Sequence, residues 1–566
     1  MNDYSDFSSA FHRVFTRDPN RCVNLGVEQN LASLPDPSES ARRTRLAEMK
    51  ELLTRLALVQ PHAMSEDERL DLELAQLHLL AAVHRDTYEW AGGHAARHTP
   101  SAGQDIGSGI FLLLTNDPRA GSDRLADITT RLERVPDYLA ALLARLEHPV
   151  ERWVSMDKEK VAGLPSLFSS VSAFAEREGY ADSTRLTRAI TRAEAALASY
   201  VAMLEKLPAI REFHVGAATA KNIVRLRGID LGLSELHGIA RDYLTRTGEQ
   251  IERLRVKLCH KYQLAPDTRV EVLEAFLNQR YAVAAPGDDL DVVLDRYRQE
   301  LALVTSFVEK SGLFPLFEQQ DIRILKTPAF MLPSIPAGAM LPPAPFRSGP
   351  PTSQIYLTLS DELLNEHTAL SIPGMIIHEA MPGHHLQLAA AAQHPSVIRK
   401  HFEAMDQAEG WTTMLEDYML DRGYMPELAD EARFIGKRDI SRIGARVGID
   451  LFFMTGDKSY LELGVPCDLS SEDPFVAANE LLCTVTGFSA ARAQAELNWY
   501  SQERGYPLSY LTGNHLVWQL KTEIANRQQG KLDGDALDRR FHEVYLAAGN
   551  MPLSSLRRVF AASGLL

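Results

Sequence analysis

The sequence has 566 residues, of which 45% are hydrophobic and 24% are charged, and its formal net charge is −15 at pH 7. This hydrophobic content excludes a disordered chain, and the length exceeds that of one ordinary core, so we expect two or more lobes. The acidic balance excludes the basic surface that binds phosphates, and with it nucleic acid as a partner.

Two features of the sequence bear on secretion and membrane insertion. The N-terminal segment MNDYSDFSSAFHRVFTRDPN lacks the apolar run of a signal peptide, and no later segment holds about 18 uninterrupted apolar residues. We therefore expect a cytoplasmic protein without a membrane partner. The four cysteines are far apart and form no CxxC pair, so we expect reduced thiols. The oligomeric state is left open.

The first 260 residues predict a succession of amphipathic helices, because apolar residues recur at spacings of three and four. No fixed period repeats their sequence, so a solenoid is not expected. The clearest helices follow Ser, Asp, Pro or Gly and cover residues 43–59, 69–90, 122–148 and 182–207.

Residues 321–361 have a different character. They are rich in proline and glycine and carry two short β-like runs, DIRIL at 321–325 and QIYLTL at 354–359. Helical patterns return from residue 368 onward. We therefore expect a mainly α protein with a small sheet near its centre.

The segment HEAMPGHH at residues 378–385 places three histidines and a glutamate within eight positions. A hydrolytic zinc site needs three protein ligands, an open position for water and a carboxylate that takes the proton of that water. His378 and Glu379 fit the first ligand and the base. In the common HExxH motif the second histidine follows four residues after the first, where this chain has Pro382.

A straight helix does not let His378 share a metal with either later histidine. At about 100° per residue, His384 points about 240° away, whereas His385 shares the face of His378 but lies roughly 10 Å along the axis. Pro382 removes a backbone donor and Gly383 tolerates unusual dihedral angles, so we expect a bulge or kink. A bulge of two residues would bring His384 to the position of a second ligand.

The segment AEGWTTMLEDY, about 30 residues downstream, offers Glu409 and Glu416 as a third ligand on a following helix. Glu416 lies on the same helical face as Glu409 and could instead orient a ligand histidine. Either glutamate could also be an ordinary surface residue. HEAMPGHH itself could be a helix end, with Pro and Gly as terminators, but its density of histidines favours metal binding.

The segment GMIIHEAMPGHHLQ at 374–387 resembles the core motif of the bacterial family catalogued as domain of unknown function 885, whose members look like helical zinc peptidases. Two further segments carry the resemblance, AEGW at 408–411 and FHEVYLAAGNMPLSSLR at 541–557. The resemblance implies a mainly α, multi-helix zincin-like fold with a small β-sheet beside the active-site helix.

The angiotensin-converting-enzyme and thimet-oligopeptidase families have an HExGH motif that is similar to HEAMPGHH with two residues inserted. This resemblance implies that His378, His384 and Glu409 hold one Zn²⁺ per chain and that Glu379 is the general base. His385 then becomes a supporting residue.

Those relatives also use a late tyrosine to donate a hydrogen bond to the oxyanion. The 885 family's late segment reads RYxxxPGQALSYKxG, and WYSQERGYPLSYLTG at 499–513 resembles it. Tyr510 is therefore the preferred oxyanion donor and Tyr500 the second candidate. The chain departs from the family pattern around the expected substrate groove, at Trp499, Arg504, Tyr506, Pro507 and Leu511, and with Met454 where a histidine is common.

The leading hypothesis is a zinc-dependent metallopeptidase that hydrolyses short peptides through a zinc-activated water. Residues 1–320 would form one wall of a cleft, and residues 321–566 the catalytic region. An extended substrate could pair with the QIYLTL edge, and Arg347 and His542 are weaker candidates for substrate contacts.

Two alternatives stay open: an amidohydrolase of a small acylated metabolite, and an inactive helical binding protein with a vestigial metal site. Cleavage from the amino end, from the carboxyl end or internally is equally open.

Overall fold

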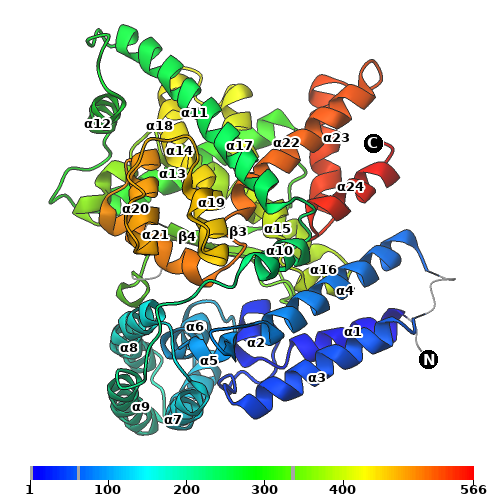
Figure 1. The fold of residues 1–566 in the computed structure, drawn as a ribbon, viewed down its shortest axis with the longest axis vertical. Helices are drawn as coiled ribbons and strands as arrows, with labels where there is room; N and C mark the ends of the chain where they lie inside the picture. The colour runs from blue at the N-terminus through cyan, green and yellow to red at the C-terminus, as the bar shows by residue number, and fades with distance from the viewer. Residues whose placement is uncertain (1–3, 60–63, 333–334, 336–337) are drawn as a thin grey trace.

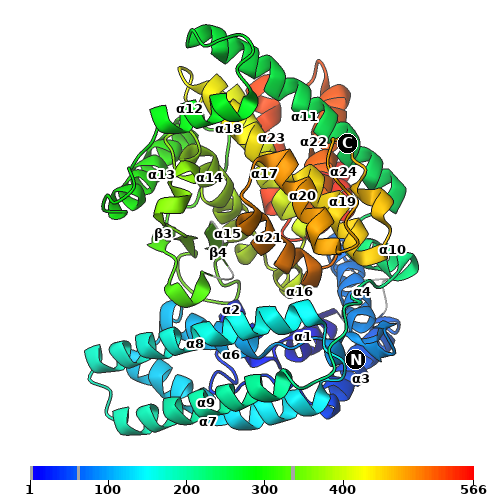
Figure 2. The same ribbon diagram turned by 60° about the vertical axis from the view of Figure 1, so that its left-hand side comes forward.

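The computed structural model describes residues 4–59, 64–332, 335 and 338–566. Within these residues the chain is mainly α-helical with small β-sheets, so the expected class is confirmed. Helices α1 to α9 lie in the lower part of Figure 1 and Figure 2, and helices α11 to α14 and α17 to α24 lie in the upper part.

The helices of the lower part include the four that the sequence predicts most clearly. The predictions are confirmed by α3, α4, α7 and α9, and α4 begins where Ser65 and Glu68 form a reciprocal capping box. The bounds of these helices are α1 (Tyr4–Phe15), α2 (Pro19–Leu25), α3 (Glu39–Leu56), α4 (Glu66–Thr87), α5 (Ala95–His98), α6 (Ala102–Thr115), α7 (Gly121–Arg145), α8 (Glu151–Arg177) and α9 (Ser183–Leu204).

The helices of the remaining chain include the two that carry most of the HEAMPGHH segment. They are α10 (Ala217–Leu226), α11 (Leu233–Lys261), α12 (Val270–Arg280), α13 (Asp291–Ser311), α14 (Ile372–Glu379), α15 (His384–Gln393), α16 (Val397–His401), α17 (Met405–Asp421), α18 (Ala429–Ile440), α19 (Arg442–Thr455), α20 (Pro474–Thr486), α21 (Ala490–Gln502), α22 (Ser509–Gln528), α23 (Gly534–Ala547) and α24 (Leu553–Ala562). Short 3₁₀ turns cover Ala329–Met331, Asp361–Glu366 and Lys458–Leu461.

The larger sheet consists of β3 (Asp321–Lys326), β4 (Gly338–Leu341) and β5 (Thr352–Leu357). Both strands expected from the sequence are confirmed as β3 and β5, although residues 333–334 and 336–337 of the same Pro-rich segment lie outside the described residues. The strand order is β3-β5-β4, so β5 is paired on both sides. The expectation that a substrate pairs with the QIYLTL edge is therefore wrong, because β5 has no free edge. A second pair of strands, β1 (Glu89–Trp90) and β2 (Gly93–His94), forms a small antiparallel ladder.

The largest hydrophobic core joins helices from both ends of the chain. Phe11 of α1 and Leu74 of α4 share one buried cluster with Ile376 of α14, Trp411 of α17 and Leu556 of α24. The motif helices are therefore fixed in the main core, where packing limits their movement. The division into residues 1–320 and 321–566 stays a prediction. None of the described helices combines the length and the apolar character needed to cross a bilayer.

Candidate metal centre

The HEAMPGHH segment is not one helix. Helix α14 ends at Glu379 and α15 begins at His384, and the connection contains a cis peptide bond before Pro382. The expected distortion is confirmed, as a complete break instead of a bulge of two residues. Glycine is required at the end of the break, because a Cβ at Gly383 would lie 2.0 Å from the carbonyl oxygen of His378.

The break brings His378 and His384 together with Glu409 of α17. Glu409 Oε2 lies 3.5 Å from His378 Nε2 and 3.4 Å from His384 Nε2. The two imidazole rings are nearly perpendicular, at 83°, with their centroids 4.9 Å apart. All three residues are buried, and one ligand atom from each lies within 4.8 Å of the others. Among the described residues these three are the only group of this kind.

The arrangement of these atoms fits a metal ion. Two ligands that each lie about 2.1 Å from a tetrahedral ion are about 3.4 Å apart, close to the separations observed here. Glu409 Oε2 is buried and has no hydrogen-bond partner among the described residues. Burying a carboxylate oxygen in this way is costly unless a cation compensates it. The structure therefore supports a candidate metal site formed by His378, His384 and Glu409.

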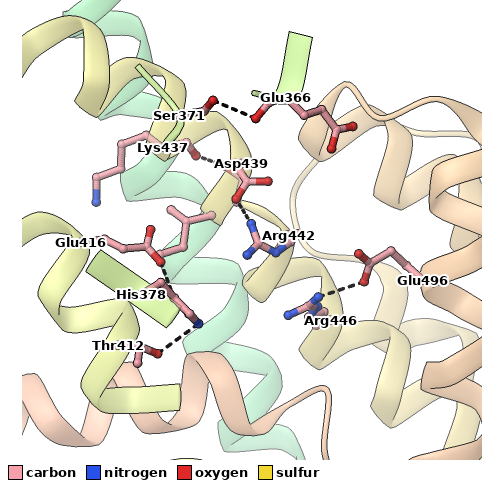
Figure 3. A network of polar contacts seen from close by, with 12 residues as sticks. Glu366, Ser371, His378, Thr412, Glu416, Lys437, Asp439, Arg442, Arg446 and Glu496 are labelled. Carbon is pink, nitrogen blue, oxygen red and sulfur yellow. Dashed lines mark hydrogen bonds and ion pairs between the residues drawn. The ribbon is translucent and has the colours of Figure 1, made fainter. Parts of the chain in front are cut away.

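Two further side chains of α17 hold the first histidine in place. Glu416 Oε1 accepts a hydrogen bond of 2.8 Å from His378 Nδ1, and Thr412 Oγ1 lies 3.2 Å from His378 Nε2 (Figure 3). Because Nδ1 is occupied, Nε2 is the nitrogen that faces Glu409. The role expected for Glu416, a carboxylate that orients a ligand histidine, is consistent with this contact.

Helix α17 is itself tied to the break and to α22. Trp411 Nε1 donates a hydrogen bond of 2.9 Å to the carbonyl oxygen of Pro382. A Cβ at Gly410 would lie 2.6 Å from the backbone carbon of Gly513, so the backbones of α17 and α22 are in close contact. Gly410 and Trp411, which lie between Glu409 and Thr412 in sequence, thus fix the position and rotation of the helix that supplies the carboxylate.

The charges of the site are strongly coupled. Burial disfavours the charged form of His378, but its contacts with the carboxylates of Glu409 and Glu416 outweigh it and raise the pKa of His378 to about 10. Burial likewise opposes ionisation of Glu409, yet the adjacent His384 and His378 hold the pKa of this carboxyl below its usual range. The site therefore pairs an ionised carboxylate with positive charge, and a metal cation can supply that charge in place of the proton.

Two tyrosines approach the carboxylate from the α22 side. Tyr506 donates a hydrogen bond of 3.1 Å to Glu409 Oε1, and the hydroxyl of Tyr510 lies 3.5 Å from that of Tyr506. Tyr510 is thus placed beside the metal ligand, as its expected role requires. Tyr506 was not predicted from the sequence, where its one signal was a departure from the family pattern. Trp499, another departure, stacks on Tyr506 with centroids 5.0 Å apart and planes at 3°.

Tyr500, the second candidate for the oxyanion donor, is placed elsewhere. Its hydroxyl accepts a hydrogen bond of 2.6 Å from Arg446 Nε and donates one of 2.7 Å to Glu496 Oε2. The side chain is fully buried. Its hydroxyl is therefore committed to a structural network, and the expected catalytic role of Tyr500 is not supported.

His385 lies next to the metal group in sequence but turns toward the sheet. Its Nδ1 is 2.8 Å from Ser353 Oγ on β5, and its Nε2 is 3.1 Å from Gln320 Oε1. Burial lowers the pKa of His385 to about 4, so the ring is neutral at physiological pH. This placement suits the supporting role expected for His385, because the ring joins α15 to the sheet.

The two weaker candidates for substrate contact have other partners. His542 is fully buried, and its Nδ1 donates a hydrogen bond of 3.0 Å to the carbonyl oxygen of Leu313. Arg347 is half-buried and donates from Nη1 to Asn116 Oδ1 at 3.2 Å. Neither residue lines the cavity at the candidate metal centre, so substrate contacts by His542 and Arg347 are not supported.

A cavity of about 890 Å³ adjoins the metal centre through His378. Its wall includes His378, the half-buried Glu379, Glu416 and Tyr510. The expected base, Glu379, thus faces the same space as a candidate metal ligand and the candidate oxyanion donor. These four residues therefore share one cavity.

Comparisons with known proteins agree with the fold. The model of the family described as "Bacterial protein of unknown function (DUF885)" matches residues 19–559. A solved "putative lipoprotein of unknown function" from Shewanella oneidensis is 18% identical with a TM-score of 0.75, and 99% of each chain is covered. A solved "putative lipoprotein" from Colwellia psychrerythraea is 15% identical with a TM-score of 0.80, again over 99% of each chain. No curated protein matches the sequence. At these identities the solved structures show a shared fold alone, whereas the family model spans nearly the whole chain, so this protein belongs to the bacterial DUF885 family.

Proposed function

We propose that this protein is a zinc-dependent metallopeptidase that hydrolyses short peptides. The observation that carries the proposal is the convergence of His378, His384 and Glu409 beside a cavity that His378 and Glu379 line. Two histidines and one glutamate with an adjacent carboxylate base form the set that zinc hydrolases with a His₂Glu site use. A zincin-like fold is part of this proposal.

Zinc is the metal that we assign to the site. Imidazole nitrogens and a carboxylate oxygen suit a borderline ion such as Zn²⁺, and no thiolate is among the three ligands. A bound zinc ion would supply Lewis acidity, which lowers the pKa of water and polarises a carbonyl group.

The residues of the chain supply the remaining chemistry. Glu379 accepts the proton of the attacking water and returns it to the leaving amine. Burial and the charge of Glu409 hold the pKa of Tyr510 above its usual range, so its hydroxyl stays protonated at neutral pH. Tyr510 can therefore donate a hydrogen bond to the substrate oxygen as negative charge develops on it.

The size of the cavity favours a peptide over a small acylated metabolite. Its volume of about 890 Å³ lies near the upper end of the range of roughly 300–1,000 Å³ for ligand pockets. A single acyl amide would leave much of this space filled with water. A short peptide would occupy it and exclude water from the reacting groups.

A peptide-library digest with mass-spectrometric readout tests the proposal. The zinc-loaded protein should cleave a subset of peptides, a chelator should abolish the cleavage, and Glu379→Gln should reduce it by about 10³-fold or more while zinc is retained. Glu194→Gln, at an exposed position of α9, is the matched control and should behave as wild type. Undiminished cleavage by Glu379→Gln, or no cleavage by the zinc-loaded wild type, would overturn the proposal.

A further inference from the structure

Two arginines of α19 lie on the wall of the cavity at the metal centre. Arg442 and Arg446 are four residues apart on one helix, so their side chains project from the same face. Figure 3 shows both guanidinium groups in the space between His378 and Glu496. The proposed reaction gives neither of them a role.

The guanidinium of Arg446 is buried but not fully satisfied. Its Nε donates to Tyr500 and its Nη2 donates to Glu496 Oε2 at 2.9 Å. Its Nη1 is buried and has no hydrogen-bond partner among the described residues. The residue is only 5% exposed, so water compensates this donor poorly. An acceptor brought by a ligand would complete the group.

Arg442 lies beside Arg446 and also has N–H groups without a hydrogen-bond partner among the described residues. Asp439 pairs with Nη1 of Arg442, and within the described chain no hydrogen bond engages Nε or Nη2. Burial, together with the positive charge of Arg446, lowers the pKa of Arg442. Neighbouring cations repel each other, and within the described chain no carboxylate contacts both of these arginines, because Asp439 pairs with Arg442 and Glu496 with Arg446.

The acidic residues nearby are already engaged, and two of them are the partners of the arginines themselves. Glu416 is bonded to His378, Glu496 to Arg446 and Tyr500, and Asp439 to Arg442. The free N–H groups of the two arginines are therefore available to an acceptor that comes from the cavity. A planar carboxylate matches the fork of a guanidinium group best.

The arginine pair is connected to the metal centre through one aromatic ring. The guanidinium carbon of Arg446 lies 4.3 Å from the ring centroid of Tyr510, whose hydroxyl is next to that of Tyr506 on Glu409. One extended residue spans about 3.3–3.6 Å, so a carboxylate at the arginines lies within a few residues of a peptide bond at the metal centre.

We propose that Arg442 and Arg446 bind the C-terminal carboxylate of a peptide substrate, so that the protein cleaves peptides near their carboxyl end. This inference rests on the proposed peptidase function and specifies the end of the peptide near which cleavage occurs. The C-terminal carboxylate is the one anionic group that every short peptide carries, whatever its side chains. Arg442 and Arg446 are thus specificity-determining residues.

The test compares trialanine, trialanine amide and a tripeptide amide with a central glutamate. With the zinc-loaded protein, kcat/KM for trialanine should exceed that for the amide by roughly 10–100-fold, the value of charged hydrogen bonds. In Arg442→Gln this preference should fall below about threefold, mainly through KM, and Arg442→Lys should restore part of it. Equal kcat/KM for trialanine and its amide would overturn the inference. Efficient cleavage of the glutamate peptide amide would overturn it in favour of an acidic side chain.

Two controls separate the possible failures. Arg433→Gln removes the same charge from a guanidinium that Asp417 and Asp421 already hold, and it should change the preference by less than about twofold. Calorimetric binding of trialanine and its amide to zinc-loaded Glu379→Gln gives a readout that does not need turnover. Binding that prefers the free acid, depends on Arg442 and occurs without any hydrolysis by wild type would refute the peptidase function and keep the carboxylate subsite. Hydrolysis without preference for the free acid would do the reverse.

Discussion

His384 Nε2 lies 3.4 Å from Glu409 Oε2, although in a straight helix His384 would point about 240° away from His378. The geometry is possible because α14 and α15 are separate helices. His384 is the first residue of α15, so its direction is set by the new helix. The connection between the two helices is therefore as important to the site as the ligands themselves.

Gly383→Ala should disrupt both the fold and the metal site. The added Cβ would lie 2.0 Å and 2.2 Å from the carbonyl oxygens of His378 and Ile377, and neither backbone group can move aside without shifting the ligand. We expect loss of bound zinc and a lower midpoint of thermal unfolding. The matched control is Gly374→Ala in α14, where a Cβ meets nothing within 4 Å and should stabilise the helix by about 0.4–1 kcal/mol. Zinc content and thermal midpoint equal to wild type in Gly383→Ala would refute this account of the break.

Glu416→Gln should weaken metal binding without unfolding the protein. The carboxylate accepts the Nδ1 hydrogen of His378, which fixes the ring and increases the basicity of Nε2. Loss of such a partner lowers metal affinity by about 10–100-fold in comparable sites. Competition with a chromogenic zinc chelator measures the change. An affinity within about twofold of wild type would show that Glu416 does not act through His378.

The ligands could be predicted from the sequence because their chemistry lies in short motifs. His378, His384 and Glu409 are recognisable by residue type and spacing, and Pro382 with Gly383 signals the break. The same holds for the amphipathic helices, whose periodicity depends on local spacing alone.

The approach of Tyr506 could not be predicted, because distant residues determine it. Asp450 of α19 accepts hydrogen bonds of 3.0 Å and 3.1 Å from the backbone nitrogens of Gly505 and Leu508, and these bonds shape the loop that carries Tyr506. The placement of β5 between two strands could not be predicted for a similar reason. The alternation of side chains along a strand indicates which face is buried, but it does not determine which strands are neighbours in the sheet. Helical periodicity likewise does not distinguish a core histidine such as His542 from one that lines a cavity.

Tyr510→Phe should lower kcat by about 10²-fold with little change in KM, since the lost hydrogen bond acts on charge that develops in the transition state. Steady-state kinetics on a cleaved library peptide measure this split. Tyr506→Phe provides the comparison, because Tyr506 is bonded to the ligand Glu409 and its loss should act on zinc affinity as well. Wild-type kcat in Tyr510→Phe, together with a large loss in Tyr506→Phe, would transfer the donor role to Tyr506.

His542 should make the protein less stable in acid. Burial lowers the pKa of His542 to about 3, whereas the unfolded side chain titrates near 6.5. The unfolded state therefore binds one more proton below about pH 6.5, and this contribution to stability is lost as the pH falls from 6.5 toward 3, at up to about 1.4 kcal/mol per pH unit.

His542→Phe keeps a ring in the stack on Phe314, where the centroids are 4.3 Å apart, but cannot titrate. Scanning calorimetry should show a shallower decrease of its thermal midpoint below about pH 6.5 than in wild type. The variant should also be less stable at neutral pH, because the carbonyl oxygen of Leu313 loses its donor. Identical pH dependence in the two proteins would contradict the buried neutral state of His542.

The metal content of the purified protein tests the central claim most directly. After loading with zinc and removal of the excess, mass spectrometry of the metal should find one zinc per chain in wild type and in His385→Asn, whose ring faces Ser353 instead of the metal group. His384→Ala should retain less than about 0.1 zinc per chain, since it removes one of three ligands. Wild-type protein without zinc, or His384→Ala with a full complement, would contradict the metal centre described here.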